Sequence, residues 1–313
     1  MIRSSLVIAL VLSTFPVMGT GVSYAVDPNA VELRASTDKK AYLAYEPVVV
    51  TFTLRNLSRE DVDLGSVSFQ SGKIRLEIAD EEMIHRPYAT GSEVLTYAGR
   101  RLVPPGSAIA SELIVLTSSL GREGVVPFPF SRPGTYSLRA SLSLEGGGGV
   151  TPSKAMEIRV AAGDPLAGPL SFFPSLEDYA ASVGADYYVP LSTETVGRWE
   201  SFVRKNPASV FAPFVARNLG RLYLDGTGLP EPDPVRAAEF FTIAARTAPK
   251  TLRDECLLGL AKAQIAAGNP TDARGTVDRI LKTNPSSVTG EEARRIREGL
   301  INGLRTLEEI SSR

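Results

Sequence analysis

Two similar stretches in the C-terminal third of the chain decide what fold to expect there. Residues 237–249 are AAEFFTIAARTAP, and residues 273–285 are ARGTVDRILKTNP. Each begins with alanine and ends in proline 12 residues later, so the two prolines are 36 residues apart. A third segment, WESFVRKNP at residues 199–207, ends in the same way. Because proline ends helices and a fixed period is typical of repeat architectures, we predict stacked helical hairpins.

The helix that would open each hairpin carries a second recurring pattern. Leu219 and Gly220 are followed by Tyr223, while Leu260 and Ala261 are followed by a glutamine in the aromatic position. On these residues the chain resembles tetratricopeptide repeat proteins, whose repeat is about 34 residues long. Small residues at these positions allow two helices to approach closely. The resemblance implies TPR-like α-helical hairpins.

We expect this all-α part to occupy residues 191–313. Its last helix does not keep the spacing of the repeat, but one apolar stripe runs along it. We interpret it as a capping helix that closes the stack; the stripe consists of Ala293, Ile296, Leu300, Leu304 and Leu307.

Residues 31–160 follow a period of two instead. In the segment 74–78, for example, Ile, Leu and Ile alternate with Arg and Glu, as expected for a half-buried antiparallel strand. Turns such as Pro-Pro-Gly at 104–106 separate the runs. The pieces at 37–48 and 132–136 resemble bacterial immunoglobulin-like domains. We therefore expect an immunoglobulin-like β-sandwich over residues 28–162, in which Tyr136 is either a tyrosine corner or an ordinary core aromatic residue.

The chain is thus expected to be multidomain, all-β followed by all-α. Glycines and prolines mark residues 163–190 as a linker and short irregular segment, in which 176–183 could form a short helix. At 313 residues, two or three units with separate cores are expected. We therefore predict that the two halves fold independently.

The first 25 residues have the three parts of a secretory signal peptide. Arg3 supplies a positive charge, residues 6–12 are apolar, and Ser23-Tyr24-Ala25 offers a site for signal peptidase. The alternative, a membrane anchor, needs about 20 apolar residues. We expect cleavage after Ala25, a mature protein without a membrane segment, and a periplasmic or secreted location. The single Cys256 is consistent with a bacterial exported protein.

The composition argues against several kinds of chemistry. The 34 basic and 35 acidic side chains nearly cancel, so nucleic acid is not an expected partner. His85 is the single histidine, and common zinc sites need several His or Cys ligands. The sequence also lacks the Gly-x-Ser-x-Gly elbow that is typical of serine hydrolases. The acidic residues near 61–63 and 80–82 form no calcium loop and are expected in solvated turns. Cys256 is expected to be a buried apolar residue. We therefore predict no enzyme activity, cofactor or metal.

The resemblance to tetratricopeptide proteins also implies a binding groove lined by the first helices of the hairpins. Arg217 and Arg221 are four residues apart, so on one helical face they could clamp a carboxylate; the alternative is that they are solvated charges. The expected function is a non-enzymatic exported binding or scaffolding protein. The alternatives are a proteinase inhibitor acting through the β domain and a carboxylate-dependent hydrolase. The residues expected to face the groove are Phe214, Arg217, Arg221, Glu255, Leu258 and Lys262.

Overall fold

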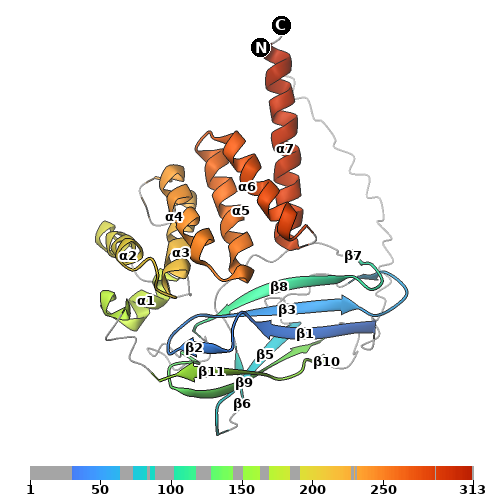
Figure 1. Ribbon diagram of the computed structural model, residues 1–313, viewed down its shortest axis with the longest axis vertical. Coiled ribbons are helices and arrows are strands. Elements are labelled where there is room, and N and C mark those ends of the chain that lie inside the picture. Colours follow the sequence, from blue (N-terminus) through green and yellow to red (C-terminus); the bar gives the residue numbers. More distant parts are fainter. Residues whose placement is uncertain are drawn as a thin grey trace, which may run out of the picture.

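The chain is of mixed α/β composition, with its strands in the first half and its helices in the second (Figure 1). A computed structural model describes residues 30–63, 73–82, 85–88, 102–117, 128–143, 151–162, 169–183, 191–226, 229, 231–285 and 287–311. The predicted signal peptide lies outside the described residues, as do residues 163–168 and 184–190 of the predicted linker. Among those that are described, no helix is both long and apolar enough to cross a membrane.

The strand region contains two main sheets. In the first, β3 (Val48–Asn56) is central and antiparallel to both β1 (Val31–Thr37) and β8 (Ala108–Val115). The second has the order β2-β11-β9-β5-β6, and in it β2 pairs with β11 in parallel. Its strands are β2 (Ala41–Leu43), β5 (Ile74–Ala79), β6 (His85–Tyr88), β9 (Gly134–Leu142) and β11 (Met156–Ala161), with β10 (Thr151–Pro152) beside β9. A short pair joins β4 (Val62–Asp63) to β7 (Leu102–Val103).

Strand alternation builds a core between the two sheets. Val48, Val50, Phe52 and Leu54 of β3 all belong to one buried cluster, which also contains residues of β5, β9 and β11. Tyr136 lies at the edge of this core, and its hydroxyl donates to the backbone oxygen of Arg132 at 2.9 Å. The tyrosine-corner alternative is therefore the one that the structure supports.

The helical region is a row of helices in which neighbours in sequence pack together (Figure 1). Three of them, α2, α4 and α6, end two residues before Pro207, Pro249 and Pro285 respectively. A hydroxyl cap begins α2 at Ser192, and a carboxylate cap begins α4 at Asp233. The elements are a 3-10 turn (Pro169–Phe172), α1 (Leu176–Ser182), α2 (Thr193–Lys205), α3 (Ala212–Asp225), α4 (Pro234–Thr247), α5 (Lys250–Ala266), α6 (Pro270–Thr283) and α7 (Val288–Ser311).

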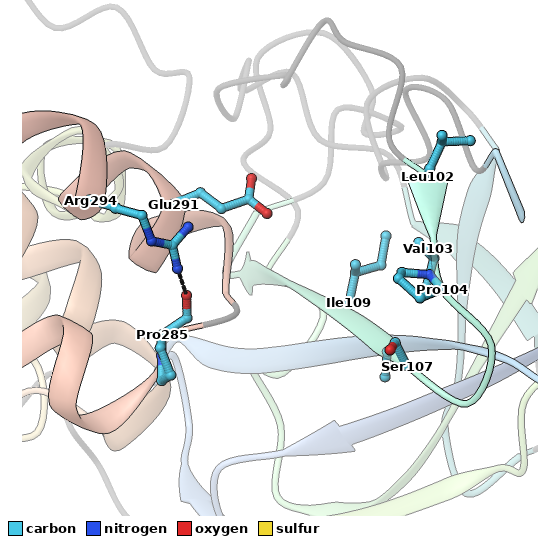
Figure 2. A pocket seen from close by; sticks show the side chains of 9 residues that line it. Leu102, Val103, Pro104, Ser107, Ile109, Pro285, Glu291 and Arg294 are labelled. Atoms are coloured by element: carbon cyan, nitrogen blue, oxygen red, sulfur yellow. Dashed lines mark hydrogen bonds between the residues drawn. The ribbon is translucent and has the colours of Figure 1, made fainter. Parts of the chain in front are cut away.

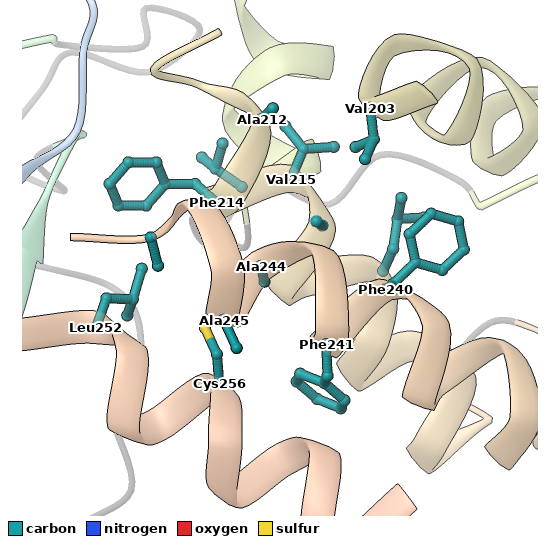
Figure 3. Packing of buried hydrophobic residues seen from close by; sticks show 14 of the residues in the cluster. Val203, Ala212, Phe214, Val215, Phe240, Phe241, Ala244, Ala245, Leu252 and Cys256 are labelled. Carbon is teal, nitrogen blue, oxygen red and sulfur yellow. The ribbon is translucent and has the colours of Figure 1, made fainter. Parts of the chain in front are cut away.

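Close helix packing in this row depends on two glycines. Phe241 of α4 lies between Gly220 of α3 and Gly259 of α5. A Cβ atom added at Gly220 would lie 2.8 Å from Phe241 Cγ; one at Gly259 would lie 2.8 Å from Cδ1 and nearer still to the ring edge. Figure 3 shows Phe241 among the buried residues of α3, α4 and α5.

The strand region and the helices each have a buried cluster of their own, but the helical cluster also takes in residues of the strand region. One buried cluster joins Val49, Leu116 and Phe128 of the strand region to residues of the 3-10 turn and of helices α1 to α7. Tyr179 of α1 is fully buried in it, and its hydroxyl donates to the backbone oxygen of Tyr45 at 2.9 Å. The segment 169–183, which the sequence left without a role, therefore joins the strand region to the helices.

Candidate functional site

The candidate site is the surface formed by helices α3, α5 and α7, which we call the α3–α5–α7 face. In the row of helices, α5 contacts both α3 and α7 as well as its neighbours in sequence. Ion pairs link the three helices in order. Arg217 of α3 binds Glu255 of α5, and Lys262 of α5 binds Glu292 of α7 at 2.7 Å. The predicted charged residues on these helices are therefore brought together.

The two arginines on this face differ in their surroundings. Arg217 is 11% exposed, and both its Nε and its Nη2 donate to the Oε1 of Glu255. Burial alone would lower the pKa of Arg217, but the charge and the hydrogen bonds of Glu255 raise it overall. Arg221 is exposed at the surface and has neither an ion pair nor a hydrogen bond to any residue that the structure describes. Burial and the charge of Arg217 lower the pKa of Arg221, but a guanidinium stays protonated in proteins, so Arg221 is still a cation that a ligand could approach.

The two apolar residues predicted for the groove are not available to a partner. Phe214 is 1% exposed and Leu258 is 8% exposed, and both belong to the buried cluster. Their predicted role is corrected: they support the α3–α5–α7 face from beneath. Helical periodicity did not separate these positions from surface ones because α3 is buried over most of its circumference.

Sequence reasoning missed Glu112, a carboxylate on β8 that is partly exposed at the surface. Burial, followed by the negative charges of Glu255 and Asp254, raises the pKa of Glu112 to about 7. Asp254 is itself only 8% exposed and accepts hydrogen bonds from Asn284 Nδ2 and from Thr283 Oγ1, the latter at 3.5 Å. No local pattern marks Glu112, because the acidic residues that raise its pKa are far away in the sequence.

A cleft lies close by, between the β7–β8 turn and the start of α7 (Figure 2). Its volume is about 280 Å³. Leu102, Val103 and Ile109 form an apolar wall on the strand side. On the helix side, Arg294 Nη2 donates to the backbone oxygen of Pro285 at 2.9 Å. The cleft is small compared with typical ligand sites of about 300–1,000 Å³, and none of the predicted site residues lines it.

The described residues offer little for nucleophilic or metal chemistry. Within them, no group of three or more His, Cys, Asp or Glu side chains is arranged to hold a metal ion. Cys256 is fully buried, and burial together with the charge of Glu255 raises the pKa of its thiol. A thiol of this kind stays protonated and is a poor nucleophile. The backbone of His85 lies on the edge strand β6.

Comparisons with known proteins give no family. No family model matches the chain, and no curated protein matches it. Among solved structures, the sporulation control protein Spo0M from Bacillus subtilis is 14% identical, with a TM-score of 0.26 over 46% of this chain and 54% of that chain.

A β-glucosidase from Erythrobacter marinus is 11% identical, with a TM-score of 0.27 over 42% of this chain and 15% of that chain. A β-glucosidase from Listeria innocua is 18% identical, with a TM-score of 0.23 over 42% of this chain and 16% of that chain. The chain therefore spans about half of Spo0M and less than a fifth of each glucosidase. Likenesses at these scores carry no argument about fold or function.

Proposed function

We propose that this protein is an exported, non-enzymatic scaffold that binds a partner protein through the α3–α5–α7 face. In this proposal, an immunoglobulin-like sandwich carries TPR-like hairpins. The observation that supports it best is the surface itself: three helices share one face, ion pairs link them across it, and Arg221 has no ion pair or hydrogen bond with any described residue.

The charge of this face favours an acidic segment as its ligand. Glu255 and Glu292 each pair with a basic residue of the neighbouring helix, whereas Arg221 forms no ion pair with any described residue. A carboxylate placed beside Arg221 would also relieve its repulsion with Arg217. A hydrogen bond to a charged group contributes about 1.5 to 3 kcal/mol, which corresponds to roughly 10- to 150-fold in affinity.

Peptides graded in net charge, measured against the full chain, test this proposal. Acidic peptides should bind, and Arg221→Gln should weaken that binding roughly 10-fold or more while the melting temperature stays near that of the wild type. Arg246→Gln is the matched control, because Arg246 is an exposed arginine of α4 without a described partner. If both variants bind acidic peptides as the wild type does, the proposal fails. Arg217→Ala is unsuitable, since it leaves Glu255 unpaired.

The hydrolase alternative has one observation in its favour and two against it. A carboxyl with a pKa near 7, such as Glu112, is typical of a general acid. The two other carboxylates, Glu255 and Asp254, already accept hydrogen bonds, however. Glu255 accepts from Arg217, and Asp254 accepts from Asn284. A carboxylate held in this way is a structural acceptor rather than a free base or nucleophile. These contacts favour the scaffold.

Export is part of the same proposal and has its own test. Sequencing the N-terminus of the mature protein should place the cut between Ala25 and Val26. An intact Met1 on membrane-bound material would contradict cleavage.

A further inference from the structure

The cleft beside the start of α7 has two unlike walls (Figure 2). On the strand side, Leu102, Val103 and Ile109 supply aliphatic side chains. On the helix side, the lining includes a carboxylate, Glu291, and a guanidinium, Arg294, which are three residues apart and so lie on one face of α7. A matching ligand is therefore apolar on one side and carries a negative and a positive charge on the other.

Asn56 holds the strand side of the cleft in place. Its side chain is fully buried, and its Nδ2 donates to the backbone oxygen of Val103 at 2.6 Å. Its backbone N–H donates to the oxygen of Ser107 at 2.9 Å, and its backbone oxygen accepts from the N–H of Gly106 at 3.0 Å. Gly106 has a φ of 71°, a conformation that favours glycine. The β7–β8 turn is thus fixed at three points, and the apolar wall is formed before any ligand arrives.

Ser287 and Gly290 fix the helix side. The Ser287 hydroxyl accepts from the backbone N–H of Gly290 at 2.9 Å and so caps the start of α7. A side chain at position 290 would collide with the backbone oxygen of Asn284, so the helix begins close against the preceding turn. Arg294 Nη2 donates to the oxygen of Pro285, which uses one of the five N–H donors of the guanidinium. Arg294 is therefore oriented at the cleft, forms no ion pair with any described residue, and retains donors for a ligand.

We propose that this cleft binds a free apolar α-amino acid, such as leucine. The carboxylate of the amino acid lies against Arg294, because a guanidinium can donate two parallel hydrogen bonds to it, and the ammonium group lies against Glu291. The side chain of the amino acid contacts Ile109 and covers Leu102, which is 59% exposed although it is apolar. The proposal goes beyond the scaffold function and does not depend on it.

Size and charge favour an amino acid over other small ligands. The volume of about 280 Å³ corresponds to roughly nine water molecules of about 30 Å³ each, which is about the size of leucine. A fatty acid would bring a second carboxylate next to Glu291, and an aliphatic amine would bring a second cation next to Arg294. Either end of a peptide carries only one of the two charges. A free amino acid is the ligand class that places an opposite charge beside each of these residues.

Titration of the full chain with leucine, followed by calorimetry or ligand-observed NMR, tests the site. Leucine should bind. Leucinol, which lacks the carboxylate, and isocaproate, which lacks the ammonium group, should each bind roughly 10-fold more weakly. In Arg294→Gln, leucine and leucinol should bind alike, because the carboxylate has lost its partner. In Glu291→Gln, leucine and isocaproate should bind alike, because the ammonium group has lost its partner.

Two further variants complete the experiment. Arg274→Gln on α6 is the matched control, since Arg274 is an exposed arginine without a described partner, and it should bind leucine as the wild type does. Leu102→Ser changes an exposed side chain, so its melting temperature should stay near that of the wild type. Its preference for leucine over glycine should fall, because the apolar wall is smaller.

Three results would overturn the proposal. Leucine might fail to bind the wild type at millimolar concentration, or it might bind Arg294→Gln and Glu291→Gln, both shown to be folded by their melting temperatures, as tightly as it binds the wild type. A peptide that begins or ends with leucine might bind as tightly as leucine itself, which would assign the cleft to a chain end.

Discussion

Gly259→Ala is expected to destabilise the protein although alanine is the better helix former. The added methyl would meet the ring of Phe241, with its Cβ 2.8 Å from Cδ1 and nearer still to the ring edge. The ring cannot move away, because Gly220 stands on its other side and a Cβ there would already be 2.8 Å from Cγ. The substitution therefore forces α5 away from α4.

The magnitude follows from two opposing effects. Overpacking a well-packed core costs about 1 to 3 kcal/mol. Because the Phe241 ring is confined on both sides, we expect the cost of Gly259→Ala to lie toward the upper end of this range. Replacing glycine by alanine inside a helix stabilises the helix by about 1 kcal/mol, because alanine has the higher helix propensity. The net loss in unfolding free energy is thus about 1 to 2 kcal/mol.

Urea unfolding of the full chain measures this difference. Trp199, the single tryptophan, is 1% exposed in α2 and reports the unfolding of the helices by fluorescence. Gly275→Ala in α6 is the matched control, because a Cβ there meets nothing within 4 Å; it should stabilise by about 0.5 to 1 kcal/mol. Adding Phe241→Leu to Gly259→Ala should recover part of the loss. If both glycine variants stabilise the protein equally, the packing argument is refuted.

Three further outcomes follow from the structure. Tyr179→Phe should lower the unfolding free energy by about 1 to 2 kcal/mol, because it removes the hydrogen bond from the buried Tyr179 side chain to the backbone oxygen of Tyr45; an unchanged urea midpoint would contradict this. A fragment of residues 169–313 should melt at a higher temperature than one of residues 191–313, since the shorter fragment loses the apolar residues of the 3-10 turn and α1; circular dichroism of the two fragments decides it. The thiol of Cys256 should react with a chromogenic disulfide reagent at the rate of unfolding, and a fast reaction in native buffer would show that it is accessible.

The sequence predicted what is local. Proline spacing placed the ends of α2, α4 and α6, because removal of a donor acts within a few residues. Period-two alternation predicted β3, β5 and β9 for the same reason.

Local sequence patterns did not predict the contacts between segments that are far apart in the sequence. The cluster that joins Phe128 to Tyr179 uses residues that any apolar core would use, so their sequence does not say which core they enter. In the candidate site, residue spacing placed Arg217 and Arg221 on one helical face. It could not show that Glu255 forms an ion pair with Arg217 and not with Arg221. No sequence pattern marked Glu112, since the acidic residues that raise its pKa belong to a helix more than a hundred residues away.

The parallel pairing of β2 with β11 has a consequence for the order in which the chain folds. Ala41 lies beside Arg159, so the second sheet cannot be completed until just over half of the chain has been synthesised. Pairings of such high contact order form slowly, whereas the helices contact their neighbours in sequence. The strand region is therefore the step that limits folding, and until it closes, the segment 169–183 lacks part of its packing surface, because Tyr179 contacts the ring of Phe128 and the backbone oxygen of Tyr45. A chaperone that covers this short segment would act while its apolar side chains are exposed and prone to aggregation.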